Sequence, residues 1–147
     1  MKKILIAIDY DPTAKRVAAE GFSMAKEMNA KVILLHVVSN PVLYYASYMA
    51  MAPVQIKGPH ELIAVSQDFL DKSKHDLGDD TIQTIVKEGD IGESILETAR
   101  DQEVDIIVLG THSRKWLENI LIGSVAENLL SLSTFPLFII PTKKLEK

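Results

Sequence analysis

A chain of 147 residues can bury a substantial core as one domain, and it has no cysteine for a disulfide or a thiolate metal site. Hydrophobic residues make up 47% and charged residues 24%, which excludes disordered and fibrous proteins. The net charge of −4 argues against broad electrostatic binding to nucleic acid or an anionic membrane, although a local basic site can still bind a phosphorylated ligand. We expect a single domain over residues 1–147 and no nucleic-acid partner.

The first apolar segment, residues 3–9, is expected to form a buried strand. Its five consecutive apolar residues are typical of a parallel sheet covered on both faces. The run is too short for a secretion signal or a membrane span, so a cytoplasmic protein with no membrane partner is expected. Asp11 and Pro12 then predict a helix start, with Asp11 as N-cap and Pro12 at the first helical position, and an apolar face that ends near Asn29.

The second buried strand is expected over residues 31–38 and contains one histidine, His36. No partner histidine or carboxylate stands at metal-site spacing nearby, so a hydrogen-bonded core histidine is preferred over a ligand or a catalyst. Residues 39–59 follow, rich in proline, tyrosine and methionine but weakly periodic. This long connection is either a lid or partner surface, or a short helix packed on the domain.

The middle of the chain predicts a helix, an edge strand and a second capped helix. The first helix covers residues 60–77 and stops at Gly78, since glycine readily adopts the conformation that ends a helix. The β-branched residues of segment 81–87 indicate a strand near the sheet edge. Asp90 is the expected N-cap of the next helix.

The last strand is expected over residues 136–141, after a helix over residues 125–132. Pro136 and Pro141 at its two ends favour an edge position, because a missing amide costs least there. An open apolar edge invites pairing with another copy, so we expect a homodimer partly through this strand.

Five strands that alternate with four helices predict an α/β domain with a mostly parallel sheet. Ligands bind such sheets beyond the carboxyl ends of the strands, where the strand order reverses. The first strand ends at Asp9, and the fourth strand, residues 105–110, ends at Gly110. These two strand ends therefore mark the expected ligand site.

The stretch from residue 105 to residue 124 joins that fourth strand to a helix start. The first amides of a helix and the helix dipole can bind an anion. Gly110 and Gly123 allow the backbone to approach a ligand closely, and the hydroxyls of Ser113 and Ser124 can donate to phosphate oxygens. The structural alternative is that the glycines end a strand and ease a turn while Ser124 caps the helix.

Four segments carry a resemblance to a known family: KILIAIDYD, VILLHVV, DIIVLGTHSRKWLENILIGSVAENLL and PLFIIP. Together they resemble the universal stress protein family along nearly the whole chain. In the nucleotide-binding branch the signature is glycine, two residues, glycine, nine residues, glycine, then serine or threonine. Gly110, Gly123 and Ser124 match this spacing, whereas Ser113 replaces the second glycine. Serine there can crowd the phosphates, add a donor, or add about 1 kcal/mol of strain if positive φ is required.

The resemblance implies a three-layer α/β fold with an open, twisted, parallel five-stranded sheet of order 3-2-1-4-5, of the Rossmann-like adenine-nucleotide alpha-hydrolase type. It implies ATP, or the related AMP or ADP, between strands one and four, with Mg²⁺ held mainly by the phosphates and no metal ligand from the protein. By the same resemblance, the residues expected at the base and ribose are Ala7, Ile8, Asp9, Val37, Leu109 and Gly110. The residues expected around the phosphates are His112, Ser113, Arg114, Gly123, Ser124, Val125 and Ala126.

The resulting expectation is a nucleotide-dependent regulator or stress-response protein that shows a changed surface to a protein partner. A phosphoacceptor receiver domain would need an aspartate after its central strand and a lysine after its last, and neither is convincing here. An ATP-cleaving enzyme would need a GxxxxGK[ST] loop or an evident nucleophile set; none is present, so no catalytic residue is assigned, although slow incidental hydrolysis is compatible. A dimeric interaction protein of the same fold that has lost nucleotide binding stays open, favoured mainly by Ser113.

Overall fold

The computed structural model describes residues 1–10, 12–38, 61–111, 129 and 132–142. Within these residues, five strands form one parallel sheet in the order β3-β2-β1-β4-β5. The strands are β1 (Lys3–Ala7), β2 (Lys31–Val38), β3 (Gln83–Glu88), β4 (Ile106–Gly110) and β5 (Leu137–Ile140). The helices are α1 (Ala14–Glu27), α3 (Glu61–Leu77) and α4 (Ile91–Asp101). The predicted strand order and fold class are thus confirmed.

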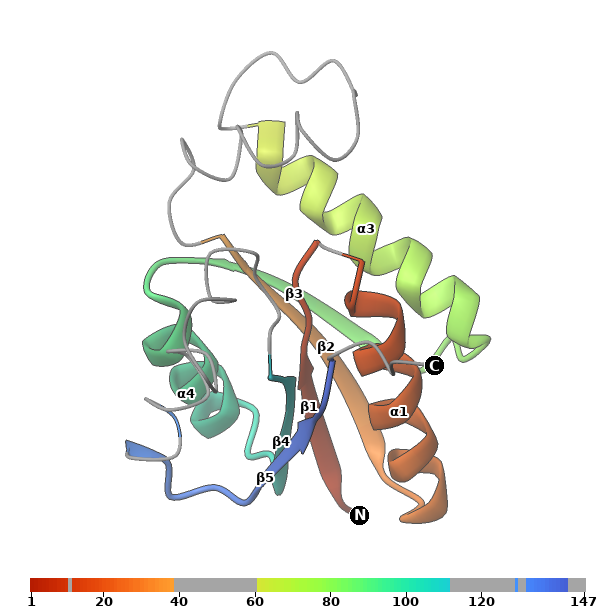
Figure 1. Ribbon diagram of the computed structural model, residues 1–147, viewed down its shortest axis with the longest axis vertical. Helices are drawn as coiled ribbons and strands as arrows, with labels where there is room; N and C mark the ends of the chain where they lie inside the picture. Colours follow the sequence, from red (N-terminus) through yellow and green to blue (C-terminus); the bar gives the residue numbers. More distant parts are fainter. Residues whose placement is uncertain (11, 39–60, 112–128, 130–131, 143–147) are drawn as a thin grey trace, which may run out of the picture.

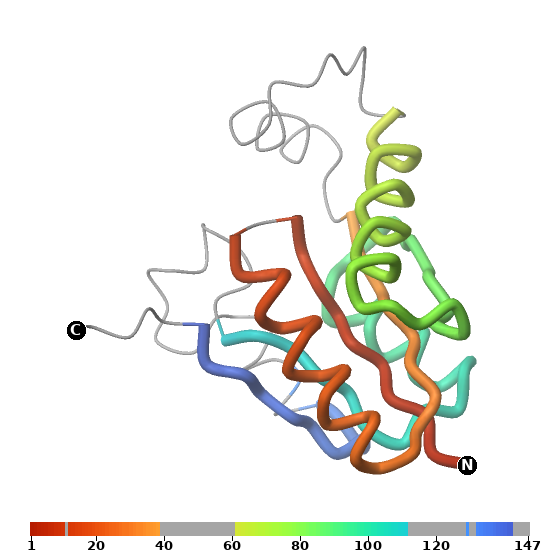
Figure 2. Tube along the Cα trace, turned by 90° about the vertical axis from the view of Figure 1, so that its right-hand side faces the viewer, coloured from red at the N-terminus to blue at the C-terminus, as the bar shows by residue number. Residues whose placement is uncertain are grey.

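The sheet is the middle layer of three. Helices α1 and α3 cover one face and α4 covers the other (Figure 1), and a quarter turn shows α1 and α3 together on one side (Figure 2). In β1, Ile4 and Ile6 pack with α1, whereas Leu5 packs with α4. All three side chains are fully buried, which explains why β1 is a continuous apolar run rather than an alternating one.

Helix α1 approaches the centre of the sheet closely at Gly21. A Cβ atom at this position would lie 2.8 Å from Cδ1 of Ile6 in β1 and 3.1 Å from Cγ1 of Val108 in β4. The first distance is too short for a packed side chain and the second is unusually tight, so Ile6 and Val108 would both have to shift. The absence of a side chain at Gly21 therefore allows one helix to contact the two strands whose carboxyl ends form the predicted site.

The predicted start of α1 is wrong. The helix begins at Ala14 and not at Pro12, and the N-cap position is occupied by Thr13, whose side chain makes no capping hydrogen bond. The amide of Val17 donates to the carbonyl of Thr13 at 3.1 Å, while Pro12 lies in the preceding turn. Asp11, the predicted N-cap, lies outside the described residues.

Two other helix boundaries agree with the prediction. Asp90 is the N-cap of α4, and its Oδ2 accepts a hydrogen bond from the Glu93 amide at 2.9 Å. Gly78 follows α3 with φ of 73°, and its amide donates to the Lys74 carbonyl at 3.2 Å. Short polar and glycine signals therefore predicted these ends well.

Strands β3 and β5 form the two edges of the sheet, as expected. On β5, Phe138 is 40% exposed, so this edge carries an accessible aromatic ring. The connection predicted over residues 39–59 lies outside the described residues. So does most of the predicted helix 125–132, of which Leu129 and Leu132 are described and helical. Leu129 is buried against the α4 face of the sheet.

Candidate functional site

The candidate site is the point where the carboxyl ends of β1 and β4 lie next to each other. The two strands pair in parallel, with Ile6 opposite Val108. Continuing this register by two residues brings Ile8 level with Gly110. Strand β1 pairs with β2 on one side and β4 on the other, so the strand order reverses here. Parallel sheets of this type bind ligands at such a reversal.

The end of β1 is held to β2 by two hydrogen bonds that continue beyond the strand. The amide of Ile8 donates to the Leu35 carbonyl at 2.9 Å. The Ile8 carbonyl lies 3.0 Å from Nδ1 of His36, a side chain with no exposed surface. Since a carbonyl only accepts, Nδ1 carries the hydrogen and donates it. The prediction of a hydrogen-bonded core histidine is confirmed.

Asp9 follows directly, and its carboxylate side chain is only 10% exposed. Its Oδ1 accepts a hydrogen bond from the Tyr10 amide at 3.0 Å and lies 3.7 Å from Nδ1 of His36. A carboxylate held this way can accept hydrogen bonds from hydroxyl groups of a ligand. Among the described residues, no group of three histidine or acidic side chains is arranged to hold a metal ion.

The end of β4 is joined to β5 instead. Gly110 pairs with Ile140, and the amide of Thr111 donates to the Ile140 carbonyl at 3.0 Å. The Thr111 hydroxyl accepts from the Thr142 amide at 3.1 Å and lies 3.2 Å from the Thr142 hydroxyl. The residue that follows β4, Thr111, is thus held to the end of β5 and to Thr142 by hydrogen bonds.

The structure brings together six of the predicted site residues and leaves seven outside its described part. Ala7, Val37 and Leu109 belong to one apolar cluster on the α4 face, at neighbouring strand ends. The Ile8 side chain instead packs on the α1 face, on the opposite side of the sheet from that cluster. Ile8 therefore contributes its backbone, and not its side chain, to the strand end. The residues outside the described part are His112, Ser113, Arg114, Gly123, Ser124, Val125 and Ala126.

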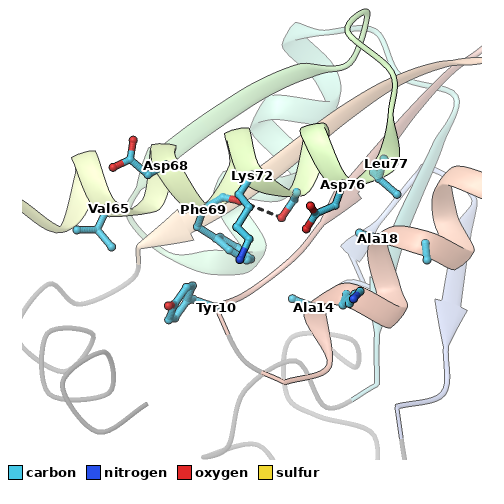
Figure 3. A pocket seen from close by; sticks show the side chains of 12 residues that line it. Tyr10, Ala14, Ala18, Val65, Asp68, Phe69, Lys72, Asp76 and Leu77 are labelled. Carbon is cyan, nitrogen blue, oxygen red and sulfur yellow. Dashed lines mark hydrogen bonds between the residues drawn. The ribbon is translucent and has the colours of Figure 1, made fainter. Parts of the chain in front are cut away.

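A groove of about 600 Å³ lies between α1 and α3, and none of the predicted site residues lines it. Figure 3 shows Phe69 and Lys72 pointing from α3 toward α1, with Tyr10 opposite Phe69. The Phe69 ring meets Tyr10 edge-on, with centroids 5.0 Å apart, and meets His36 in the same way at 5.8 Å. Sequence reasoning missed this aromatic cluster, because α3 periodicity predicts that Phe69 faces inward but not which rings it contacts.

No helix in the described part of the chain combines the length and apolarity that crossing a bilayer requires. This finding agrees with the balance of charged and apolar residues along α1, α3 and α4.

Known proteins resemble this chain over nearly its full length. Universal stress protein A of Yersinia pestis is 28% identical, with 97% of this chain and 93% of that protein covered. Universal stress protein MJ0577 of Methanocaldococcus jannaschii is also 28% identical, with 97% and 96% covered. The solved structure of protein MJ0577 superposes with a TM-score of 0.76 at 27% identity and covers 98% of both chains.

Two further solved structures contain nucleotides. A universal stress protein in complex with cAMP has a TM-score of 0.66 at 20% identity, with 97% of this chain and 98% of that chain covered. The universal stress protein of Archaeoglobus fulgidus in complex with dAMP has a TM-score of 0.63 at 16% identity, with 95% and 98% covered. These two likenesses concern the fold. The model of the universal stress protein family matches residues 1–141, and the chain therefore belongs to that family.

Proposed function

We propose that the protein binds an adenine nucleotide at the carboxyl ends of β1 and β4 and acts as a nucleotide-dependent regulator in a stress response. The observation that carries this proposal is the nearly buried Asp9 carboxylate, held at the strand-order reversal next to the end of β4. Two relatives of the same fold are complexes with cAMP and dAMP, which supports adenine nucleotides as the ligand class.

Each part of the nucleotide has a proposed set of contacts. The Asp9 carboxylate accepts hydrogen bonds from the ribose hydroxyls, and a hydrogen bond to a charged, desolvated acceptor is stronger than one between neutral groups. The cluster that contains Ala7, Val37 and Leu109 offers apolar contact for the adenine, and Val37 offers backbone groups. The Gly110 backbone starts the phosphate site, which the motif residues 112–114 and 123–126 complete.

The proposed nucleotide is ATP, with AMP or ADP as close alternatives. Mg²⁺ would be held mainly by the phosphates and water, which is the usual arrangement for this ion. The proposed role is binding and not catalysis. We also propose a cytoplasmic location, because ATP, ADP and AMP, the proposed ligands, are present in the cytoplasm.

Calorimetric titration of the full chain with ATP, ADP and AMP tests the proposal. We expect saturable heat with ATP and only slow phosphate release. No heat and no thermal shift at millimolar nucleotide would instead favour an interaction protein that does not bind nucleotide, and fast phosphate release would favour an enzyme.

Two variants locate the ligand. Gly123→Val adds a side chain at the motif position expected beside the phosphates and should abolish binding in a protein that remains folded. Ser113→Gly restores the family signature and should retain binding or tighten it. Unchanged affinity in Gly123→Val would place the nucleotide elsewhere.

A second proposal concerns assembly. Strand β5 is an edge strand, and its Phe138 is 40% exposed. Unpaired strand edges with accessible apolar side chains are suited to pairing with another copy, so we propose a homodimer through β5. Sedimentation analysis should give a dimer for the wild type and a monomer for Phe138→Lys. A monomeric wild type at high concentration would contradict this assembly.

A further inference from the structure

His36 is a fully buried titratable side chain for which the proposed function as stated has no role. It lies on β2 with its ring directed at the neighbouring strand end. Its Nδ1 is 3.0 Å from the Ile8 carbonyl and 3.7 Å from Oδ1 of Asp9. On another side, the ring meets the Phe69 ring edge-on at 5.8 Å. One imidazole therefore connects β2 and α3 to the two residues that follow β1.

The contacts of His36 determine how the chain leaves β1. Regular pairing of β1 with β2 ends at Ala7. Beyond it, both backbone groups of Ile8 are held, because its amide donates to the Leu35 carbonyl at 2.9 Å and its carbonyl accepts from His36. That carbonyl belongs to the peptide bond between Ile8 and Asp9, so its hydrogen bond orients the start of the next residue. That next residue is Asp9, whose carboxylate is the proposed ribose acceptor.

We propose that His36 is a positioning residue for nucleotide recognition. The hydrogen on its Nδ1 fixes the Ile8 carbonyl, and the same nitrogen lies 3.7 Å from Oδ1 of the Asp9 carboxylate. The carboxylate thereby keeps one orientation, with Oδ1 also bonded to the Tyr10 amide at 3.0 Å. Recognition groups bind best when their supporting contacts hold them in place beforehand. The inference rests on the proposed function, since it requires Asp9 to contact the nucleotide.

A purely structural role for His36 predicts a different result. A buried polar side chain can often be replaced by an apolar one of similar size at little cost when its partner finds another bond. In that case, substitution would change stability alone. A positioning role requires that loss of the Nδ1 donor weakens nucleotide binding and that a replacement donor restores it.

A matched set of variants separates the two roles. His36→Leu fills much of the volume without a donor. His36→Asn carries an amide nitrogen at the same number of bonds from the backbone as Nδ1. Phe69→Leu removes the ring that packs on His36 but leaves the hydrogen bond, and it serves as the control. All are titrated with ATP and AMP after circular dichroism confirms folding.

We expect His36→Leu to weaken ATP and AMP binding about tenfold, the effect of one lost hydrogen bond. We expect His36→Asn and Phe69→Leu to remain within about threefold of the wild type. Equal affinity in His36→Leu and the wild type would overturn the positioning role while leaving the proposed function intact. A wild type that binds neither nucleotide would overturn both.

Two measurements do not depend on nucleotide. The ¹⁵N spectrum of the imidazole in the wild type should show hydrogen on Nδ1, and hydrogen on Nε2 alone would overturn the proposal even if His36→Leu fails to fold. Amide hydrogen exchange at Tyr10 should be faster in His36→Leu and normal in His36→Asn. Unchanged exchange in both variants would show that His36 does not hold the end of β1.

Discussion

The two strand ends that meet at the candidate site are held by different means. The end of β1 is fixed from inside, by a buried imidazole of β2 that bonds the Ile8 carbonyl and lies beside Asp9. The end of β4 is fixed from the sheet edge, through Thr111 and its bonds to β5. Interior contacts resist solvent competition, whereas edge contacts are partly wet. In the proposed site, the interior contacts at the end of β1 hold the Asp9 carboxylate in place, whereas the edge contacts at the end of β4 position the backbone of Gly110.

Gly21→Val should disturb β1 and β4 together, and we expect it to have the largest effect on stability. The added side chain would press on Ile6 of β1 and Val108 of β4, where even a Cβ atom would be 2.8 Å and 3.1 Å from them. We expect a loss of about 3 kcal/mol in the free energy of unfolding, measured by urea denaturation. Ala19→Val, on the exposed side of the same helix, should cost only about 0.5 kcal/mol. Similar losses in the two variants would contradict the close approach of α1.

Asp9→Ala should affect the β1 side alone. Removing the carboxylate should weaken ATP binding roughly 30-fold, or about 2 kcal/mol, the usual value for a hydrogen bond to a charged group. Isothermal titration calorimetry measures this loss of ATP affinity. Asp9→Asn retains an oxygen for the Tyr10 amide and controls for the local turn. Wild-type affinity in Asp9→Ala would exclude the carboxylate from the nucleotide site.

Thr111→Val should affect the β4 side and leave nucleotide affinity unchanged. The variant loses the hydroxyl that accepts from the Thr142 amide, and we expect about 1 kcal/mol less stability in thermal denaturation. Thr142→Val loses the other hydroxyl of the pair. If the two hydroxyls bond each other, the double variant should lose less than the sum of the single losses. Full additivity would show that the hydroxyls are independent.

The smallest effect is expected at the opposite end of the sheet, where Asp79 precedes β3. Hydrogen bonds from the Thr81 hydroxyl at 2.6 Å and the Thr81 amide at 2.8 Å hold the pKa of Asp79 below its usual range. A lowered pKa in the folded state stabilises the fold above the usual aspartate range, and this contribution is lost as the pH falls through the folded-state pKa. Thr81→Val should raise the pKa of Asp79 in an NMR titration without changing ATP affinity. A pKa that stays equally low would assign the shift to other groups.

Much of the fold could be predicted because its signals are local. The continuous apolar run of residues 31–38 predicted β2 with the observed bounds, and Asp90 predicted the start of α4. The start of α1 could not be predicted, since Pro12 is equally suited to a turn before a helix and to its first position. The meeting of the first and fourth strand ends was predicted from parallel-sheet topology, and β4 ends at Gly110 as predicted. Strand β1 ends at Ala7, two residues before the predicted Asp9, and the contacts that hold the two ends were not predicted.

The sequence alone determined the alternation of strands and helices, the burial of the central strands and the family to which the chain belongs. These depend on apolar patterns and short motifs that neighbouring residues define. Only the tertiary structure decided that His36 holds the Ile8 carbonyl and that Gly21 lies against both β1 and β4. Such contacts join residues far apart in the chain, and they follow from strand register and helix position, which local patterns do not encode.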